Sequence, residues 1–268
     1  MFTRLLAISF LSIPYFSDAQ VISFQGAHSA GIAHTSVTYA DGLSIYNNAG
    51  SLGFLEKSSI ATGYQNHYEV EGLNTVFAVI NNRIKTGAIS IGVSAFGDEL
   101  FSISRVSTGL GNRFGIAALG VTLHYIQYRI EGFGSHGFIS VDVGGLAELS
   151  PLLFIGGRIK NINQAKVSKF PDEYYPTILT AGISYRPTDQ LRFNTQIDKD
   201  LEFPAKLKFG LEYKINALSL RTGLNTQPLW FSFGFGFIHK KFILDYALQN
   251  NYLLSRTHSI SIFYQIKN

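Results

Sequence analysis

Apolar and polar residues alternate along much of the chain, and this alternation is its dominant pattern. It is clearest at residues 230–237, where Phe occupies every second position and Trp or small residues fill the others. Residues 206–215 repeat it, with Leu, Phe, Tyr and Ile alternating with Lys, Gly and Glu. A period of two is typical of β-strands, whose successive side chains point to opposite faces. Both segments are therefore predicted to be strands with one apolar face.

The same alternation continues between turn signals as far as the end of the chain. The signals include Asn81-Asn82, Gly111-Asn112 and Pro187–Asp189, and Gly109–Gly111 is likewise assigned to a hairpin turn. Between such signals we count about fourteen strand candidates from Ser58 to Lys267, roughly 15 residues apart, which suits tilted membrane strands with short connections. The pattern predicts an antiparallel up-and-down β-barrel.

Alternation alone does not say which face of the sheet is covered by lipid. A secreted soluble β protein is the alternative, and it would place the apolar face inward. About fourteen strands, however, enclose an interior too wide for side chains to fill, so an apolar lining would be left unpacked. Only 15% of the residues are charged, against about 25% in soluble domains. We therefore predict an all-β transmembrane barrel whose Phe stripe at 231–237 faces lipid rather than a ligand.

The first nineteen residues have the pattern of a secretory signal peptide. Arg4 provides a positive start, residues 5–16 form an apolar run, and Ser17–Ala19 is a cleavage site of small residues. No later segment approaches 18 consecutive apolar residues, so no transmembrane helix is predicted. Export combined with membrane-type strands predicts location in the outer membrane of a Gram-negative cell.

Residues 20–57 differ from the barrel segment, residues 58–268. They are rich in Gly and Ala, and Gly26–Gly31 and Asp41–Leu52 suit short helical turns better than strands. A polar segment of small residues ahead of a wide barrel is a candidate plug, since it must fill the lumen or hang free. We therefore predict a small N-terminal luminal plug, or hatch.

This segment resembles the start of FadL-type outer-membrane barrels, and within them the PorV and PorQ group of the type IX secretion system of Bacteroidota. That group opens with G-A-R-x-A-G-M-G-G and A-D-D-x-x-x-x-x-x-N-P-A-G-L. His28 stands where Arg is usual, and Asn47-Asn48 where Asn-Pro is usual. The plug-motif residues are Gly26, Gly31, Asp41, Asn47, Asn48 and Gly50, and later matches in the same order include Gly182–Pro187, Gly210–Tyr213 and Phe233–Gly236.

The resemblance implies a fourteen-stranded barrel with a hatch, surrounded by outer-membrane lipid. Its first implied function is that of a non-enzymatic accessory component in type IX protein secretion or surface attachment, with secretion-system components or secreted cargo as partners. The alternative is a FadL-like channel for fatty acids or other hydrophobic small molecules.

Charged side chains on the less apolar strand faces are candidate lumen-facing groups. One interpretation is the paired charge of any water-filled barrel interior. The other is a basic inner wall that pairs with Asp41 in the plug or attracts the anionic head of a ligand. The candidates are Arg186, Lys206, Lys208, Glu212, Lys214, Arg221 and Asp245.

The residues that carry enzyme chemistry form no recognisable constellation. The segment around Ser29 comes close to the G-x-S-x-G elbow, but it lacks the first Gly and the β/α alternation that the elbow requires. The chain has no Cys, its seven His are scattered, and no run of Lys or Arg exceeds two residues. No catalytic residue, cofactor, metal site or nucleic-acid partner is therefore predicted.

Overall fold

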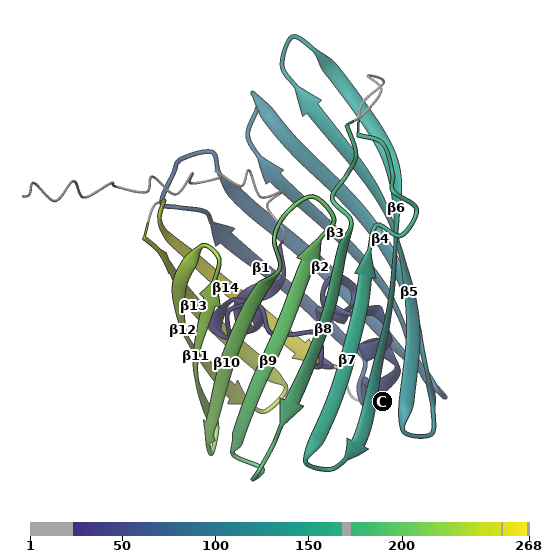
Figure 1. The fold of residues 1–268 in the computed structure, drawn as a ribbon, viewed down its shortest axis with the longest axis vertical. Helices are drawn as coiled ribbons and strands as arrows, with labels where there is room; N and C mark the ends of the chain where they lie inside the picture. The colour runs from purple at the N-terminus through teal and green to yellow at the C-terminus, as the bar shows by residue number, and fades with distance from the viewer. Residues whose placement is uncertain (1–23, 168–172, 253, 267–268) are drawn as a thin grey trace, which may run out of the picture.

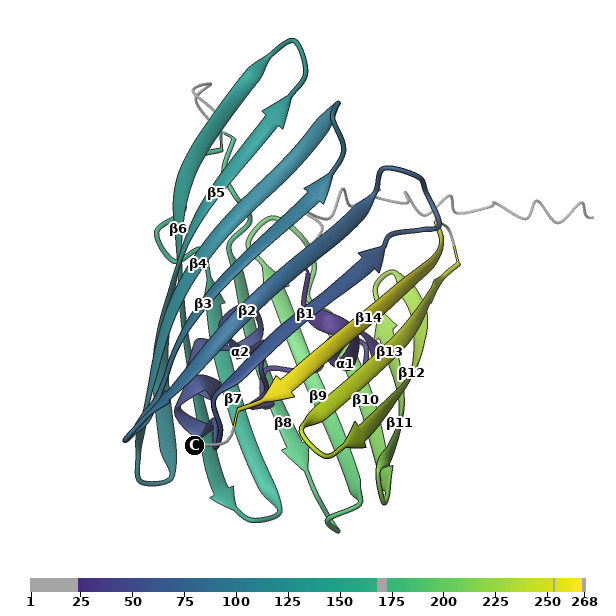
Figure 2. The same cartoon turned by 180° about the vertical axis from the view of Figure 1, so that it is seen from behind.

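The computed structural model describes residues 24–167, 173–252 and 254–266 (Figure 1). Within them, fourteen antiparallel strands form one closed barrel. Each strand pairs with its neighbours in the sequence, and β1 (Ser59–Asn66) closes the ring by pairing with β14 (Ser255–Gln265) (Figure 2). The predicted up-and-down β-barrel is thus confirmed. The predicted signal peptide, residues 1–19, lies outside the described residues.

The remaining strands follow in chain order. They are β2 (Asn74–Ile84), β3 (Gly87–Gly97), β4 (Phe101–Phe114), β5 (Ala117–Ile130), β6 (Gly134–Ser150), β7 (Leu153–Lys160), β8 (Ile178–Tyr185), β9 (Leu191–Asp200), β10 (Lys206–Ile215), β11 (Leu218–Thr226), β12 (Leu229–His239) and β13 (Phe242–Asn251).

The alternation in each strand separates an apolar exterior from a polar lumen. Phe233 on β12 is 57% exposed on the outside, whereas Glu212 on β10 is 1% exposed on the inside. Phe231, Phe235 and Phe237 share the outer face with Phe233, as predicted for a lipid-facing stripe. An apolar exterior on a closed barrel is the arrangement that a bilayer stabilises, because no backbone edge is left unpaired in lipid.

The two ends of the barrel differ. At one end, here called the turn end, strands are joined by two residues, except for five between β8 and β9. The other, here called the loop end, carries mostly longer connections, such as residues 161–177 between β7 and β8, although two residues join β11 to β12 there. β5 and β6 reach farthest at the loop end, while β7 and β8 are short (Figures 1 and 2).

Three of the predicted turns are wrong. Asn81-Asn82 lies within β2, and both Gly109–Gly111 and Gly111-Asn112 lie within β4. The physical reason is the plug: Asn81 Nδ2 donates a hydrogen bond to the carbonyl of Gly42 at 2.9 Å, and a Cβ added to Gly111 would lie 2.6 Å from the Ala49 carbonyl oxygen. These residue types are required by contacts across the lumen rather than by a turn.

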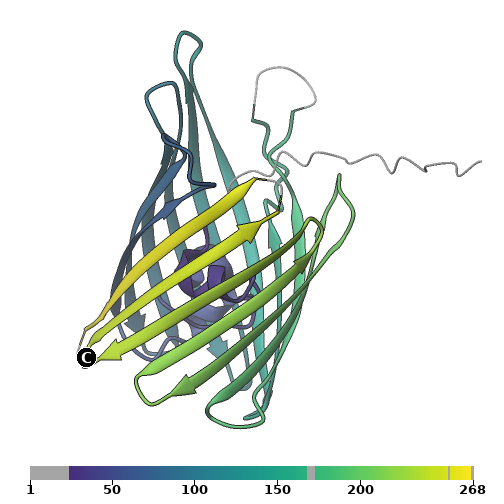
Figure 3. The same ribbon diagram turned by 90° about the vertical axis from the view of Figure 1, so that its left-hand side faces the viewer.

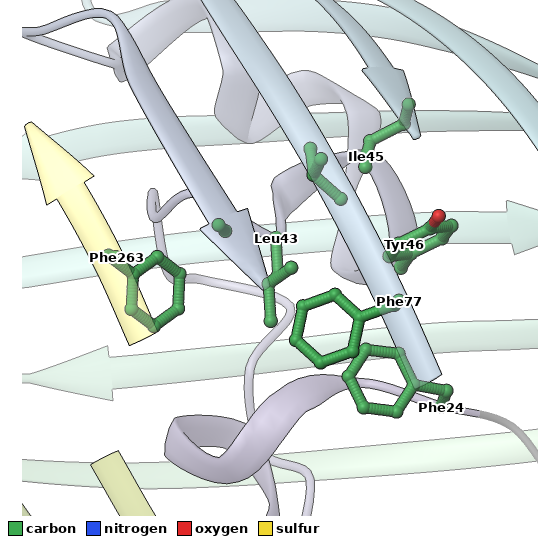
Figure 4. Packing of buried hydrophobic residues seen from close by; sticks show 8 residues of the cluster. Phe24, Leu43, Ile45, Tyr46, Phe77 and Phe263 are labelled. Carbon is green, nitrogen blue, oxygen red and sulfur yellow. The ribbon is translucent and has the colours of Figure 1, made fainter. Parts of the chain in front are cut away.

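Residues 24–55 form the plug, which lies inside the barrel (Figure 3). It contains α1 (Gly26–Gly31), α2 (Ser44–Asn47) and the 3-10 helix η1 (Ala49–Phe54). None of the helices in the described part of the chain is long and apolar enough to cross a membrane. The main apolar cluster joins the plug to the wall: Phe24, Leu43, Ile45 and Tyr46 pack with Ala61, Phe77, Val79 and Phe263 (Figure 4).

Candidate functional site

A cluster of buried charges joins the plug to the wall, with Glu212 of β10 at its centre. Glu212 Oε2 accepts hydrogen bonds from Arg221 Nε at 2.6 Å and from His28 Nε2 at 3.1 Å. Its other oxygen accepts one from the Tyr39 hydroxyl at 3.2 Å. Arg221 also donates from Nη1 to Asp245 on β13 at 2.6 Å. Glu212 therefore satisfies groups from both the plug and the wall.

His28 is held between two carboxylates. Its Nδ1 lies 3.1 Å from Asp41 Oδ2, and its Nε2 contacts Glu212. An ionised carboxylate only accepts hydrogen bonds, so both ring nitrogens must carry protons and the imidazole is charged. Burial and the Arg221 charge oppose protonation, but the hydrogen bonds to Asp41 and Glu212 outweigh them and raise the pKa of His28 above its ordinary value. His28 is the plug's cation in this cluster.

The asparagine pair of the plug motif fixes the path of the plug backbone. Asn48 Nδ2 donates to the carbonyls of Val37 at 2.6 Å and of Gly145 on β6 at 2.9 Å, while Asn48 Oδ1 accepts from the Gly50 N–H. Asn47 Nδ2 donates to the Gln25 carbonyl at 3.2 Å. Asn48 thus caps η1 and joins it to the wall, because one amide can both accept and donate.

Two arginines of the wall hold the plug by its backbone. Arg158 of β7 donates from Nη1 to the carbonyls of Tyr46 and Asn47, each at 2.7 Å. Arg192 of β9 donates to the Thr38 carbonyl at 2.8 Å, and its guanidinium lies 3.3 Å from the centre of the Tyr39 ring. Neither arginine is among the residues predicted from the sequence, although Arg192 occupies an inward position of an alternating strand, beside Asn194 and Gln196.

Glycines on both sides let η1 and α1 approach the wall closely. A Cβ added to Gly50 would lie 2.5 Å from the Gly145 Cα, and one on Gly120 would collide with the Ala49 carbonyl oxygen. A Cβ on Gly31 would lie 3.3 Å from the Gly234 Cα. Gly26 opens α1 at φ 84°, a conformation that glycine adopts without strain.

The plug separates two cavities of the lumen. The turn-end cavity has a volume of about 850 Å³ and is lined by charged residues of both signs, including Arg113, Glu148 and Arg192. The loop-end cavity has a volume of about 190 Å³ and combines rings, such as Trp230 and Phe203, with several basic residues.

His34 of the plug lies at the loop-end cavity and is uncharged. Burial, helped by the charge of Lys208, lowers the pKa of His34 to about 3. The Gln249 amide nitrogen lies 2.8 Å from His34 Nε2, and a neutral imidazole can accept a hydrogen bond from that amide. The two plug histidines thus differ in charge because their partners differ.

The predicted lumen-facing charges lie in three groups: at the loop-end cavity, in the buried cluster at the plug, and at the turn-end cavity. Lys206 and Lys208 line the loop-end cavity, where Lys208 forms an ion pair with Asp198 at 2.6 Å. Glu212, Arg221 and Asp245 form the buried cluster at the plug. At the turn-end cavity, Lys214 Nζ lies 3.5 Å from Glu212 Oε1, and Arg186, in the β8–β9 turn, lies 4.0 Å above the Phe154 ring.

Ser29 lies in a hydrogen-bond network inside the plug. Its hydroxyl donates to Gln25 Oε1 at 3.1 Å and can accept from the Ser36 hydroxyl, whose Oγ lies 2.8 Å away, and it is fully buried in α1. Across the described residues, no group of three or more His, Cys, Asp or Glu side chains is arranged to hold a metal ion.

Comparison with known proteins matches this chain at the level of the fold. No family model matches the sequence, and a search of curated proteins gives no match. Among solved structures, the chain is similar to the monoaromatic hydrocarbon channel CymD, with a TM-score of 0.71 and 13% identity over 91% of this chain and 98% of that one. It is equally similar to the toluene transporter TbuX of Ralstonia pickettii, with a TM-score of 0.71 and 14% identity over 92% and 100%.

A FadL homologue of Pseudomonas aeruginosa gives a TM-score of 0.65 at 10% identity, over 91% of this chain and 98% of that one. Identities this low bear on the fold alone. The similarity is one of fold, and it extends over nearly the whole length of both chains in each pair. This protein therefore has the fold of FadL-type barrels.

Proposed function

We propose that the protein is an outer-membrane channel for hydrophobic small molecules, closed at rest by its plug. The observation that carries this proposal is that the plug lies between two cavities of the lumen. It is held there by side-chain hydrogen bonds that are separate from the backbone pairs of the wall. Short turns face the periplasm in bacterial barrels, so the loop end faces outward and its cavity meets the ligand first.

The loop-end cavity offers apolar surface to a ligand beside its polar and charged lining. Trp230, Phe203 and Ile178 supply apolar surface there, as is usual for small-molecule sites. The fold neighbours described as hydrocarbon channels or toluene transporters agree with this choice. They favour the channel over the secretion-accessory role that the PorV and PorQ resemblance implies.

Uptake into outer-membrane vesicles tests the proposal. Vesicles that contain the protein should take up a hydrophobic probe such as toluene faster than matched vesicles without it, while uptake of a polar sugar such as arabinose stays the same. Equal rates for toluene would contradict the channel. The secretion role is tested separately: deletion of the gene should leave the set of surface-attached proteins unchanged, and loss of those proteins would favour that role instead.

A further inference from the structure

Tyr175, in the connection between β7 and β8, lies inside the barrel and is 1% exposed. Its ring centre lies 5.3 Å from that of Phe138, and both belong to an apolar cluster with Ile126. Tyr128 packs edge-on against Phe138 at 5.5 Å. These wall residues occupy inward positions of β5 and β6, so they form an aromatic lining in the outer part of the lumen.

The polar end of this tyrosine meets two cations. Arg105 of β4 donates from Nη2 to the Tyr175 hydroxyl at 3.0 Å, and the Lys160 ammonium lies 4.8 Å from the ring centre. Arg105 Nε has no hydrogen-bond partner. With the residues that the structure describes, neither cation forms an ion pair to a carboxylate.

The acidic neighbour of these cations is already engaged. Asp142 of β6 accepts from the Asn161 N–H at 2.9 Å, and its other oxygen lies 3.4 Å from His124 Nε2. Burial by itself raises the pKa of Tyr175, but Arg105 and Lys160 outweigh it and lower that pKa below its ordinary value. The surroundings of the phenol oxygen therefore favour negative charge.

The Tyr175 side chain and its two cations are adjacent to the loop-end cavity. Lys160, whose ammonium lies against the Tyr175 ring, and Pro176, which follows Tyr175 in sequence, both line that cavity. A molecule in the cavity is therefore next to the aromatic lining and its two cations, with the Tyr175 side chain filling the position between them.

We propose that Tyr175 occupies a binding site for a single-ring aromatic molecule with an acidic oxygen, a phenol or an aromatic carboxylate, which replaces the tyrosine side chain there. The inference rests on the proposed channel function and names its ligand class. A bare hydrocarbon fills the lining but leaves the half-buried Arg105 guanidinium, whose Nε is buried, without an acceptor, which is costly. An oxygen anion supplies that acceptor through a charge-assisted hydrogen bond.

Titration calorimetry of the purified barrel in detergent tests the site, with benzoate and toluene as probes. Tyr175→Ala empties the site and should bind benzoate roughly tenfold or more tightly than the wild type does, because the new bond is charge-assisted. Adding Arg105→Met to Tyr175→Ala should abolish the gain for benzoate but leave toluene binding in place. Tyr175→Leu retains apolar volume and protects the fold, and it should show the same preference with a smaller gain.

Two results would overturn the site: benzoate binding that Tyr175 substitution leaves unchanged, or a gain that persists without Arg105. A preference for toluene over benzoate in both Tyr175→Ala and Tyr175→Leu would overturn the ligand class. Binding in detergent does not depend on passage across a membrane. A barrel that gains benzoate binding but passes no toluene would therefore contradict the channel and leave the site standing.

Discussion

At the scale of single residues, the plug depends on His28 and Glu212. The motif that residues 25–33 resemble has Arg where this chain has His28. Both side chains can place a cation between Asp41 and Glu212, but an imidazolium loses its charge much nearer to neutral pH than a guanidinium does. The fastening of the plug in this chain is therefore sensitive to pH.

Replacing Glu212 tests the buried cluster. In Glu212→Ala, Arg221 and His28 lose their shared acceptor while still buried, so the barrel should lose about 3–5 kcal/mol of unfolding free energy. The loss is measured by urea unfolding in detergent, with heat-modifiable migration on a gel as the readout of the folded fraction. Glu148→Ala is the matched control: its ion pair with Arg113 is partly exposed, and its removal should cost about 0–1 kcal/mol. Equal losses would contradict the central role of Glu212.

The pH dependence follows from the direction of the His28 shift. Its pKa in the folded protein is raised above the ordinary 6.5, so protonated His28 stabilises the plug fully below that value. This contribution is lost as the pH rises through the raised pKa. Protease cleavage of the plug should therefore increase as the pH is raised above 6.5 in the wild type and stay flat in His28→Gln. If the pH dependence of cleavage is unchanged in His28→Gln, another titrating group is responsible for it.

At the scale of elements, the alternating pattern predicts the strands well because every strand separates lipid from lumen. The prediction fails where strand residues serve the plug. Asn81 and Gly111 resemble turn residues, yet they are in strands because one binds the plug backbone and the other makes room for it. Arg158, Arg192 and Tyr175 were missed for the same reason, since their partners lie far away in sequence.

The glycine contact of η1 offers a direct test. Gly120→Ala places a methyl group against the Ala49 carbonyl and should destabilise the docking of η1 by about 1–3 kcal/mol, the usual cost of overpacking. Hydrogen exchange of residues 49–54 should speed up accordingly. Gly157→Ala is the control, because its new Cβ would meet its nearest neighbour, the Thr180 carbonyl, at an ordinary 3.6 Å. If the hydrogen exchange of η1 is unchanged in Gly120→Ala, the wall strand moves to make room for the methyl group and the docking of η1 is not strained.

At the scale of the whole molecule, the barrel and the plug have separate tasks. The wall is stabilised by lipid outside and by a closed ladder of strand pairs, whereas the lumen is filled by a segment that contributes no strand. In the proposed channel, movement of the plug would therefore open the lumen with no change in the strand pairs of the wall.

Deleting residues 24–57 tests the plug as the barrier. The shortened barrel should give steady ion conductance in a planar bilayer, because its wide polar lumen is no longer filled, while the full chain should stay closed most of the time. Equal conductance of the two would mean that the wall or the loops close the lumen. Heat-modifiable migration checks that the shortened chain still forms a barrel.

The apolar cluster in Figure 4 crosses the place where the ring of strands closes. Phe263 comes from β14 and Ala61 from β1, and both belong to one cluster with Leu43 and Phe24 of the plug, while the Ala27 N–H donates to Ser261 of β14 at 2.9 Å. The first and last strands to be synthesised are thus brought together over the earliest part of the described chain. During insertion this segment can act as an internal template for the final pairing, so a chain without it should assemble more slowly even where the finished barrel is stable.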